Sequence, residues 1–227
     1  MRHFPWGSRL ARLAALTALL WLARARVGMA AARAATDLES PGVTADQAVQ
    51  AARSGFLALP GYRTTMRFFQ KEGAREARGL YAVTGMPPLT IRIHIVKGTG
   101  QGTTLLWNGG PTAQVRPAGF LHFATFTLSI TDDRLVSIRG YSLAQTNLDA
   151  LLAQAANRQN RRRLVTATPP TVSVRGPDLL PGCVRMLVRL EPRTLRPVTI
   201  EAFDARQKVF EIDLSHLEVV KSPQVHL

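Results

Sequence analysis

The sequence predicts an α+β fold in which a curled antiparallel sheet, a half-barrel, carries two or three short helices packed on its concave side. Apolar and polar residues alternate with a period of two from residue 62 almost to the end of the chain. Turn residues, chiefly glycine and proline, separate the alternating segments. Helical spacing occurs in only two segments after residue 43, so the helices are small relative to the sheet.

The two helices are each marked by a capping residue. Thr44 precedes the first helix, residues 45–57, and Gln47 completes a capping box three positions later. Asn147 is placed to cap the second helix, residues 148–156. Both helices are rich in alanine and therefore fill little volume.

The alternating segments predict strands that follow one another in one long antiparallel meander. Gly73, the Asn108-Gly109 pair and the proline at 192 supply typical turn residues between them. The expected strands cover residues 62–68, 79–83, 89–95, 103–107, 114–116, 120–130, 172–175, 183–191, 197–204 and 208–217.

The beginning of the chain has the layout of a secretory signal peptide. Arg2, Arg9 and Arg12 precede a short apolar run at residues 13–22, and no acidic residue occurs before Asp37. The apolar run is shorter than the stretch of about 20 residues that crosses a bilayer. Small residues typical of a cleavage site follow it.

We therefore expect a signal peptide at residues 1–34, cleaved near Ala34, and a protein exported to the periplasm. The alternative is an uncleaved membrane anchor. Residues 35–43 are polar and are expected to form a flexible arm. No linker divides residues 44–227, which are expected to form a single domain.

The excess of positive charge is partly due to this leader. The chain has 29 Lys and Arg against 15 Asp and Glu, and six of the arginines lie in residues 1–34. The rest, with 23 basic and 15 acidic residues, carries +8. This charge favours transient contact with anionic membrane surfaces. It does not indicate nucleic-acid binding, because the one dense cluster, Arg158 with residues 161–163, suits a solvated cap at the end of the second helix.

The single cysteine excludes an intramolecular disulfide. Cys183 lies beside a Pro-Gly pair and is expected to be a small strand residue rather than a reactive thiol. It does not follow the leader directly, so the arrangement that precedes acylation of a lipoprotein is absent.

No catalytic or metal-binding motif is recognisable, so we expect no enzymatic activity, no metal and no cofactor. None of the histidines after residue 34 stands at metal-ligand spacing; they are His94, His122, His216 and His226. The pair Asp132-Asp133 predicts a turn between apolar segments. If the protein were nevertheless an enzyme, the first residues to mutate would be His122, His216, Asp132 and Asp133.

One face of the predicted sheet is apolar along its length. Such a face is either filled by the protein's own helices or left open for an apolar ligand, and small alanine-rich helices favour a gap. The residues expected to line that cavity are Met66, Phe68, Ile91, Ile93, Ile95, Leu105, Trp107, Met186, Val188, Leu190, Ile200, Phe210, Ile212 and Leu214.

The order of these segments resembles the LolA/LolB-like superfamily. The similarity is carried by "GYRTTMRFFQKEG", "ARGLYAV", "MPPLTIRIHIV" and "TTLLWNGG", and by the closing "RLEPRTLRPVTIEAFDARQKVFEIDLSHLEVV". Residues 107–110 resemble the hairpin after the third long strand of that superfamily. Residues 191–197 followed by Asp204 resemble its C-terminal hairpin.

This resemblance implies a half-barrel with an apolar cavity for acyl chains, as in periplasmic carriers of lipoproteins. In those carriers an arginine just before the proline of the third-strand motif helps to control the lid. Here Gly85 and Met86 precede Pro87, and Arg92 lies within the strand instead.

We therefore expect a periplasmic protein that binds or carries lipid or lipoprotein acyl chains in a half-barrel cavity. The expected partners are a lipid or an acylated protein, an envelope protein and, transiently, a membrane surface, with no nucleic acid and with the chain as a monomer. The alternative is an envelope sensor or interaction module on the same fold, without lipid transport.

Overall fold

The computed structural model describes residues 43–214 and 216–227. The predicted signal peptide, its cleavage near Ala34 and the predicted arm up to residue 42 lie outside the described residues. The chain divides into the units Met1–Val43 and Thr44–Leu227. The description that follows concerns Thr44–Leu227 by itself.

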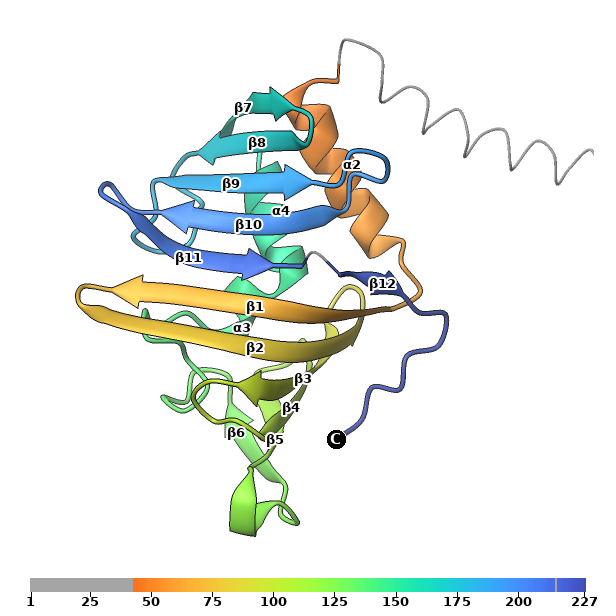
Figure 1. The fold of residues 1–227 in the computed structure, drawn as a ribbon, viewed down its shortest axis with the longest axis vertical. Helices are drawn as coiled ribbons and strands as arrows, with labels where there is room; N and C mark the ends of the chain where they lie inside the picture. Colours follow the sequence, from red (N-terminus) through yellow and green to blue (C-terminus); the bar gives the residue numbers. More distant parts are fainter. Residues whose placement is uncertain (1–42, 215) are drawn as a thin grey trace, which may run out of the picture. The chain divides into compact units, whose positions relative to one another are not determined.

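An open, curled antiparallel sheet of 12 strands dominates this unit (Figure 1). The predicted α+β class with a curled sheet is confirmed. The strands are β1 Tyr62–Glu72, β2 Arg75–Met86, β3 Thr90–Lys97, β4 Thr104–Asn108, β5 Thr112–Arg116, β6 Phe126–Ser129, β7 Arg161–Ala167, β8 Pro170–Arg175, β9 Arg185–Leu190, β10 Pro197–Phe203, β11 Lys208–Asp213 and β12 Glu218–Val219.

The sheet consists of two meanders rather than the single one that the sequence suggested. The strand order is β6-β5-β4-β3-β2-β1-β11-β10-β9-β8-β7, and the short β12 also pairs with β1. The two meanders meet where β1 pairs with β11, with Phe68 opposite Ile212 and Gln70 opposite Phe210. Period-two alternation defines faces and turns but not which strands become neighbours, so it missed this junction.

The helices begin where the sequence predicts. In α2, Ala45–Leu57, the Thr44 hydroxyl accepts from the Gln47 amide at 3.2 Å, and the Gln47 side chain accepts from the Thr44 amide at 2.9 Å. In α4, Leu148–Ala156, Asn147 Oδ1 accepts from the Ala150 amide at 3.0 Å. Two further short helices, α3 at Leu143–Thr146 and the 3-10 helix η1 at Gly119–Leu121, carry too few residues for a periodic signal.

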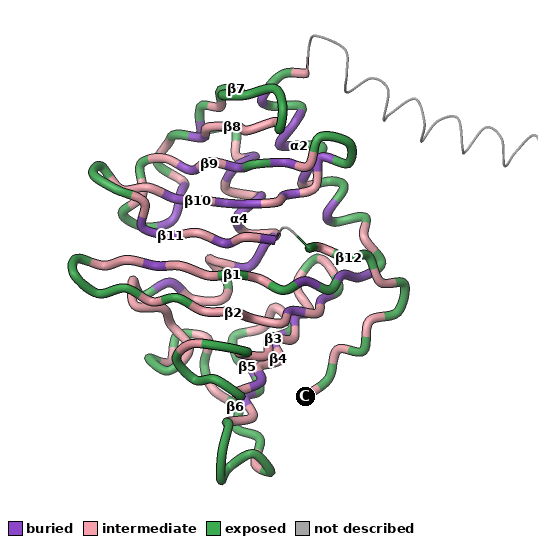
Figure 2. The backbone as a smooth tube through the Cα atoms, viewed as in Figure 1, coloured by how far each residue is buried: buried purple, intermediate pink, exposed green. Residues whose placement is uncertain are grey.

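The helices α2 and α4 pack on the half of the sheet that contains β7–β10 (Figure 1). In Figure 2 buried backbone is concentrated in these helices and in β9 and β10, whereas β2 and β3 are mostly intermediate. Burial of each large apolar side chain there stabilises the fold by about 1.5–3 kcal/mol. The fully buried members of this core include Val49, Leu151, Leu152, Val172, Val174, Met186, Val188, Leu190 and Ile200.

Two local predictions are corrected. Of residues 120–130, only Phe126–Ser129 forms a strand, and the preceding residues form η1 and an exposed loop. The arginines at 161–163 open β7, where Arg161 and Arg163 are exposed as expected, whereas Arg162 is not solvated. The Arg162 side chain is only 9% exposed, and its Nη1 donates to the carbonyls of Ala155 at 3.2 Å and Asn157 at 2.6 Å, so it caps α4 from the sheet.

Candidate functional site

A cavity of about 720 Å³ lies against the half of the sheet formed by β1–β6 and β11, where α2 contacts the start of β1 through the rings of Phe56 and Tyr62. Its floor is formed by the concave faces of β1–β6 and β11. Its other wall is the cover segment, which we define as residues 134–148 and which includes α3 and the start of α4. The volume falls within the range of about 300–1,000 Å³ that is typical of small-molecule sites.

The position of the cavity follows from the size of the helices. Ala48, Ala52 and Ala155 contribute small side chains to the packed half, where the α2–α4 pair and the sheet meet closely. The remaining half is covered by the cover segment, whose irregular backbone does not pack as a continuous layer on the strands. A space lined by apolar side chains is left between them.

Nine of the fourteen predicted residues line this cavity. They are Met66, Phe68, Ile91, Ile93, Ile95, Leu105, Phe210, Ile212 and Leu214. They belong to β1, β3, β4 and β11 and the residue after it, so the alternation in the sequence places them on one face.

The other five predicted residues are buried and lie outside the cavity lining. Met186, Val188, Leu190 and Ile200 are all 0% exposed in β9 and β10, in the packed half of the sheet. Trp107 is buried at the end of β4, where its indole Nε1 donates to the Gly110 carbonyl at 2.7 Å. The sequence placed these residues on an apolar face correctly, but it does not reveal what covers that face.

Sequence reasoning missed the apolar side chains of the cover segment. Leu135, Val136, Ile138 and Tyr141 all line the cavity. They follow neither the helical nor the strand period, so no periodic signal could have found them. Their one sequence signal is an apolar cluster between a turn and a helix.

Two polar residues of β1 that sequence reasoning also missed face the cavity. Thr64 is 3% exposed and Gln70 is 0% exposed. Among the described residues, neither the Thr64 hydroxyl nor the amide nitrogen and oxygen of Gln70 has a hydrogen-bond partner. Because buried polar atoms in native structures nearly always have partners, these three atoms require an explanation.

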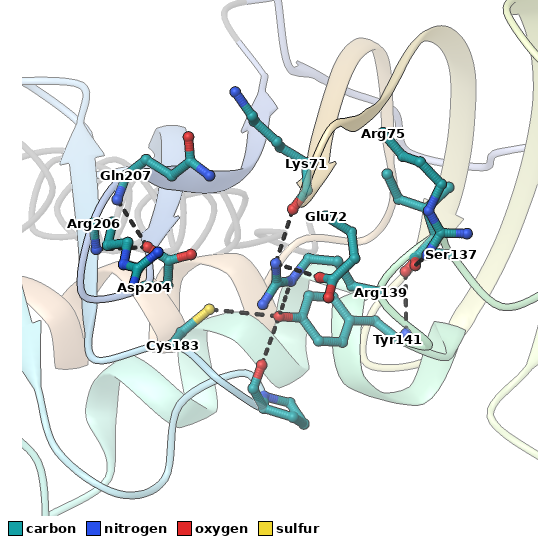
Figure 3. A network of polar contacts seen from close by, with 12 residues as sticks. Lys71, Glu72, Arg75, Ser137, Arg139, Tyr141, Cys183, Asp204, Arg206 and Gln207 are labelled. Carbon is teal, nitrogen blue, oxygen red and sulfur yellow. Dashed lines mark hydrogen bonds and ion pairs between the residues drawn. The ribbon is translucent and has the colours of Figure 1, made fainter.

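The cover segment is fastened to β1 by Arg139 (Figure 3). The Arg139 Nη1 donates to the Lys71 carbonyl at 2.8 Å and pairs with Glu72 Oε2 at 2.6 Å, while Nε donates to the Tyr141 hydroxyl at 2.8 Å. That hydroxyl in turn donates to the Pro181 carbonyl at 2.7 Å. The network therefore joins the cover segment to both halves of the sheet unit.

Replacing Arg139 with methionine should loosen the cover segment. The Arg139 side chain is only 11% exposed, so loss of its charged hydrogen bonds should cost about 1–3 kcal/mol. Hydrogen exchange of the amides at residues 137–143 should accelerate, while exchange in β9 and β10 should change little. Arg75→Met is the matched control, because the Arg75 guanidinium lies 3.5 Å from the Ile138 carbonyl, at the limit of a hydrogen bond. Equal exchange in the two variants would contradict the assigned contacts.

Cys183 lies just before β9, and its Sγ is 3.5 Å from the Tyr141 hydroxyl. Burial raises the pKa of the Cys183 thiol, which keeps it protonated and weakly nucleophilic. Burial also raises the pKa of Tyr141, so its hydroxyl remains a donor. Cys183 therefore acts as a packed side chain, although it precedes the strand instead of lying in it.

The residues considered for catalysis do not form a site. Asp132 lies in a turn, as predicted, and the Arg134 guanidinium that binds both of its oxygens at 2.8 Å lowers the pKa of Asp132 to about 2. Asp133, His122 and His216 are exposed. Within residues 43–214 and 216–227, no group of three or more His, Cys, Asp or Glu is placed to hold a metal ion.

The loop between β5 and β6 exposes large apolar side chains. Phe120 is 87% exposed and Phe123 is 71% exposed, and their rings contact each other edge to face with centroids 6.0 Å apart. Leu121 and Phe126, which are also exposed, line the cavity. Figure 1 shows this loop extending beyond the ends of β5 and β6. The exposed aromatic loop (residues 119–126) is therefore continuous with the cavity lining.

Thr44–Leu227 thus form a half-barrel, an open curled sheet that encloses an apolar cavity beneath a covering segment. No described helix has both the length and the apolar character needed to cross a membrane. The sequence matches no family model, and no curated protein matches it.

Solved structures with a similar fold include three bacterial proteins. A DUF1329 family protein from Desulfovibrio piger is 11% identical, with a TM-score of 0.44, and the match covers 78% of this chain and 94% of that one. A LolA superfamily protein from Nitrosomonas europaea is 12% identical, with a TM-score of 0.38, and the match covers 80% of this chain and 96% of that one. A putative outer membrane lipoprotein-sorting protein domain from Vibrio parahaemolyticus is 11% identical, with a TM-score of 0.40, and the match covers 75% of this chain and 91% of that one. These similarities concern the fold alone.

Proposed function

We propose that the protein is an exported binding protein that holds acyl chains of a lipid or lipoprotein in the half-barrel cavity. The observation that carries this proposal is the cavity of about 720 Å³ with its lining of aliphatic and aromatic side chains. Burial of an acyl chain contributes about 0.8 kcal/mol per methylene group. A chain of ordinary length can therefore bind by apolar burial alone, and the protein acts by binding, without catalysis.

The near absence of charged groups from the described cavity lining also suits an uncharged chain. Among the described lining residues, Arg134 is the only one whose side chain is charged at neutral pH. Its guanidinium is already bound by Asp132. An ion placed among the isoleucines of β3 would be desolvated without a partner, which is costly. The site therefore favours the hydrocarbon part of an amphiphile.

We propose that the acyl chain enters and leaves the cavity on the side of the exposed aromatic loop. Its phenylalanines can enter the headgroup region of a bilayer, and the +8 charge of residues 35–227 attracts anionic lipids. Because Leu121 and Phe126 belong both to this loop and to the cavity lining, a chain leaving the bilayer stays in contact with apolar groups. Export rests on the sequence of residues 1–34.

Native mass spectrometry of the protein purified gently from a cell envelope tests the binding function directly. We expect adducts with the mass of a lipid or of an acylated peptide, and saturable uptake of a fluorescent fatty acid by the emptied protein. A protein that carries no adduct under any gentle condition and takes up no fatty acid would contradict the proposal.

Replacing both Phe120 and Phe123 with serine should weaken binding to anionic vesicles. The two rings are the most exposed large apolar groups of the described chain, so we expect a loss of roughly tenfold or more in vesicle affinity. Cosedimentation with vesicles measures it. The matched control replaces Val165 in β7 and Val184 just before β9 with serine as well; these valines are 55% and 52% exposed and lie away from the loop. Vesicle affinity that falls equally in both double variants would rule out docking through this loop.

A further inference from the structure

We propose that the ligand carries a neutral polar group inside the cavity, and that this group both donates and accepts hydrogen bonds at Gln70. This inference rests on the proposed function and specifies the ligand class: an acyl chain whose buried end is a carboxamide or a carboxyl group in its protonated form. The polar group would lie beside β1 and β11, with the hydrocarbon extending over Phe68 and Met66.

The position of Gln70 is fixed by the strands around it. It pairs in register with Ala77 of β2 and Phe210 of β11, both of which also line the cavity. Alternation along β1 places Gln70 on the same concave face as Met66 and Phe68. Its side chain therefore faces the cavity from the middle of the sheet, where three strands hold its backbone.

The amide of Gln70 lacks partners although its surroundings contain polar groups. Across the cavity the Tyr141 hydroxyl is already engaged, since it donates to Pro181 and accepts from Arg139. Ser137 Oγ accepts from the Tyr141 amide. Among the described residues, no group is hydrogen-bonded to either atom of the Gln70 amide, which is 0% exposed. A packed apolar side chain at this position would avoid the loss that an unpaired buried amide causes.

The chemistry of a primary amide selects its partner. Gln70 offers two N–H donors and one carbonyl acceptor in one plane. A carboxamide or a protonated carboxyl group presents the complementary donor and acceptor, so both atoms of Gln70 can pair at once. A carboxylate has no donor, and the cavity offers no free cation in its described lining, because Arg134 is bound by Asp132.

Thr64 marks the opposite end of the same strand face. Its unpaired hydroxyl is separated from Gln70 by Met66 and Phe68, which at the rise of a β-strand is roughly 20 Å. A single planar head group cannot reach both residues. Gln70 leaves two atoms unpaired and Thr64 leaves one, so we assign the head group to the Gln70 end.

Competition against a fluorescent fatty acid, with three probes of equal chain length, tests this assignment. The probes are dodecanamide, methyl dodecanoate and dodecanoate at neutral pH. We expect the wild-type protein to bind dodecanamide roughly tenfold more tightly than methyl dodecanoate, which cannot donate a hydrogen bond. Dodecanoate should bind more weakly than dodecanamide, because the ionised group must be neutralised or desolvated.

Gln70→Leu should abolish the preference, so that the amide and the methyl ester bind with similar affinities. Met66→Leu, a change in the apolar lining of the same strand, should retain the preference. The assignment is overturned by an unchanged preference in Gln70→Leu, by equal wild-type affinities for amide and ester, or by tighter binding of dodecanoate than of dodecanamide.

The wild-type ratio of amide to ester affinity decides the outcome even if the Gln70→Leu protein were to misfold. The outcomes also separate this inference from the proposed function. Equal, saturable binding of the amide and the ester would leave acyl-chain binding intact and remove the head-group site at Gln70. Failure of all three probes and of the fluorescent fatty acid to bind would overturn both.

Discussion

Ile200→Ala should lower the free energy of unfolding by about 2–5 kcal/mol, the range for large-to-small substitutions in a packed core. The Ile200 side chain is 0% exposed and lies in β10, in the half of the sheet that α2 and α4 cover. Its truncation leaves a void that the surrounding strands and helices cannot fill by collapse.

The same substitution at Ile93 should cost about 1 kcal/mol, because the side chain of Ile93 is only partly buried and already faces the cavity. Both residues lie inside antiparallel strands, so the change in strand propensity is common to the two variants. Urea unfolding of the pair measures the difference. Equal losses would mean that the β3 half is as tightly packed as the β10 half, and the cavity would have no basis.

Met66→Asp should reduce the affinity for a fluorescent fatty acid by roughly 100-fold, because it places an unpaired carboxylate among the apolar groups of the lining. Met66 lies near the middle of β1 and contributes to the cavity floor. The neighbouring residue, Thr65, is exposed on the opposite face of the strand.

Thr65→Asp is therefore a control with the same chemical change one position along the chain. It should leave fatty-acid affinity within about twofold of wild type, since the charge remains in water. Fluorescence titration of both variants, with circular dichroism to verify folding, measures the contrast. Similar affinities for the two variants would place the acyl chain elsewhere on the protein.

The elements of the fold could be predicted where a local rule sets them. Thr44 and Asn147 predict the starts of the two longer helices, because a capping side chain must lie next to the first turn in sequence. Alternation over residues 62–68 identified a strand with one apolar face, because successive side chains of a strand point to opposite faces. These signals are local, and tertiary contacts reinforce them.

The candidate site could be predicted only in part. Residues such as Ile91 and Ile93 were assigned to the cavity by their face, and they line it. Met186 and Ile200 have the same pattern but lie in the packed half, because the difference between core and cavity depends on where the helices dock. Gln70 was missed because the charged residues after it suggested a turn, so the strand was expected to end at 68 instead of Glu72.

The pairing of β1 with β11 also has a consequence for folding. Gln70 and Phe210, which face each other across this seam, are 140 positions apart in the chain. Closing so long a loop carries a large entropic penalty before any contact compensates for it, and folds dominated by such distant pairings form slowly. During synthesis, which starts at the N-terminus, the backbone groups along one edge of β1 therefore stay unpaired until nearly all of the chain has been made. During that interval the protein should be most dependent on chaperones and most prone to aggregate through this edge.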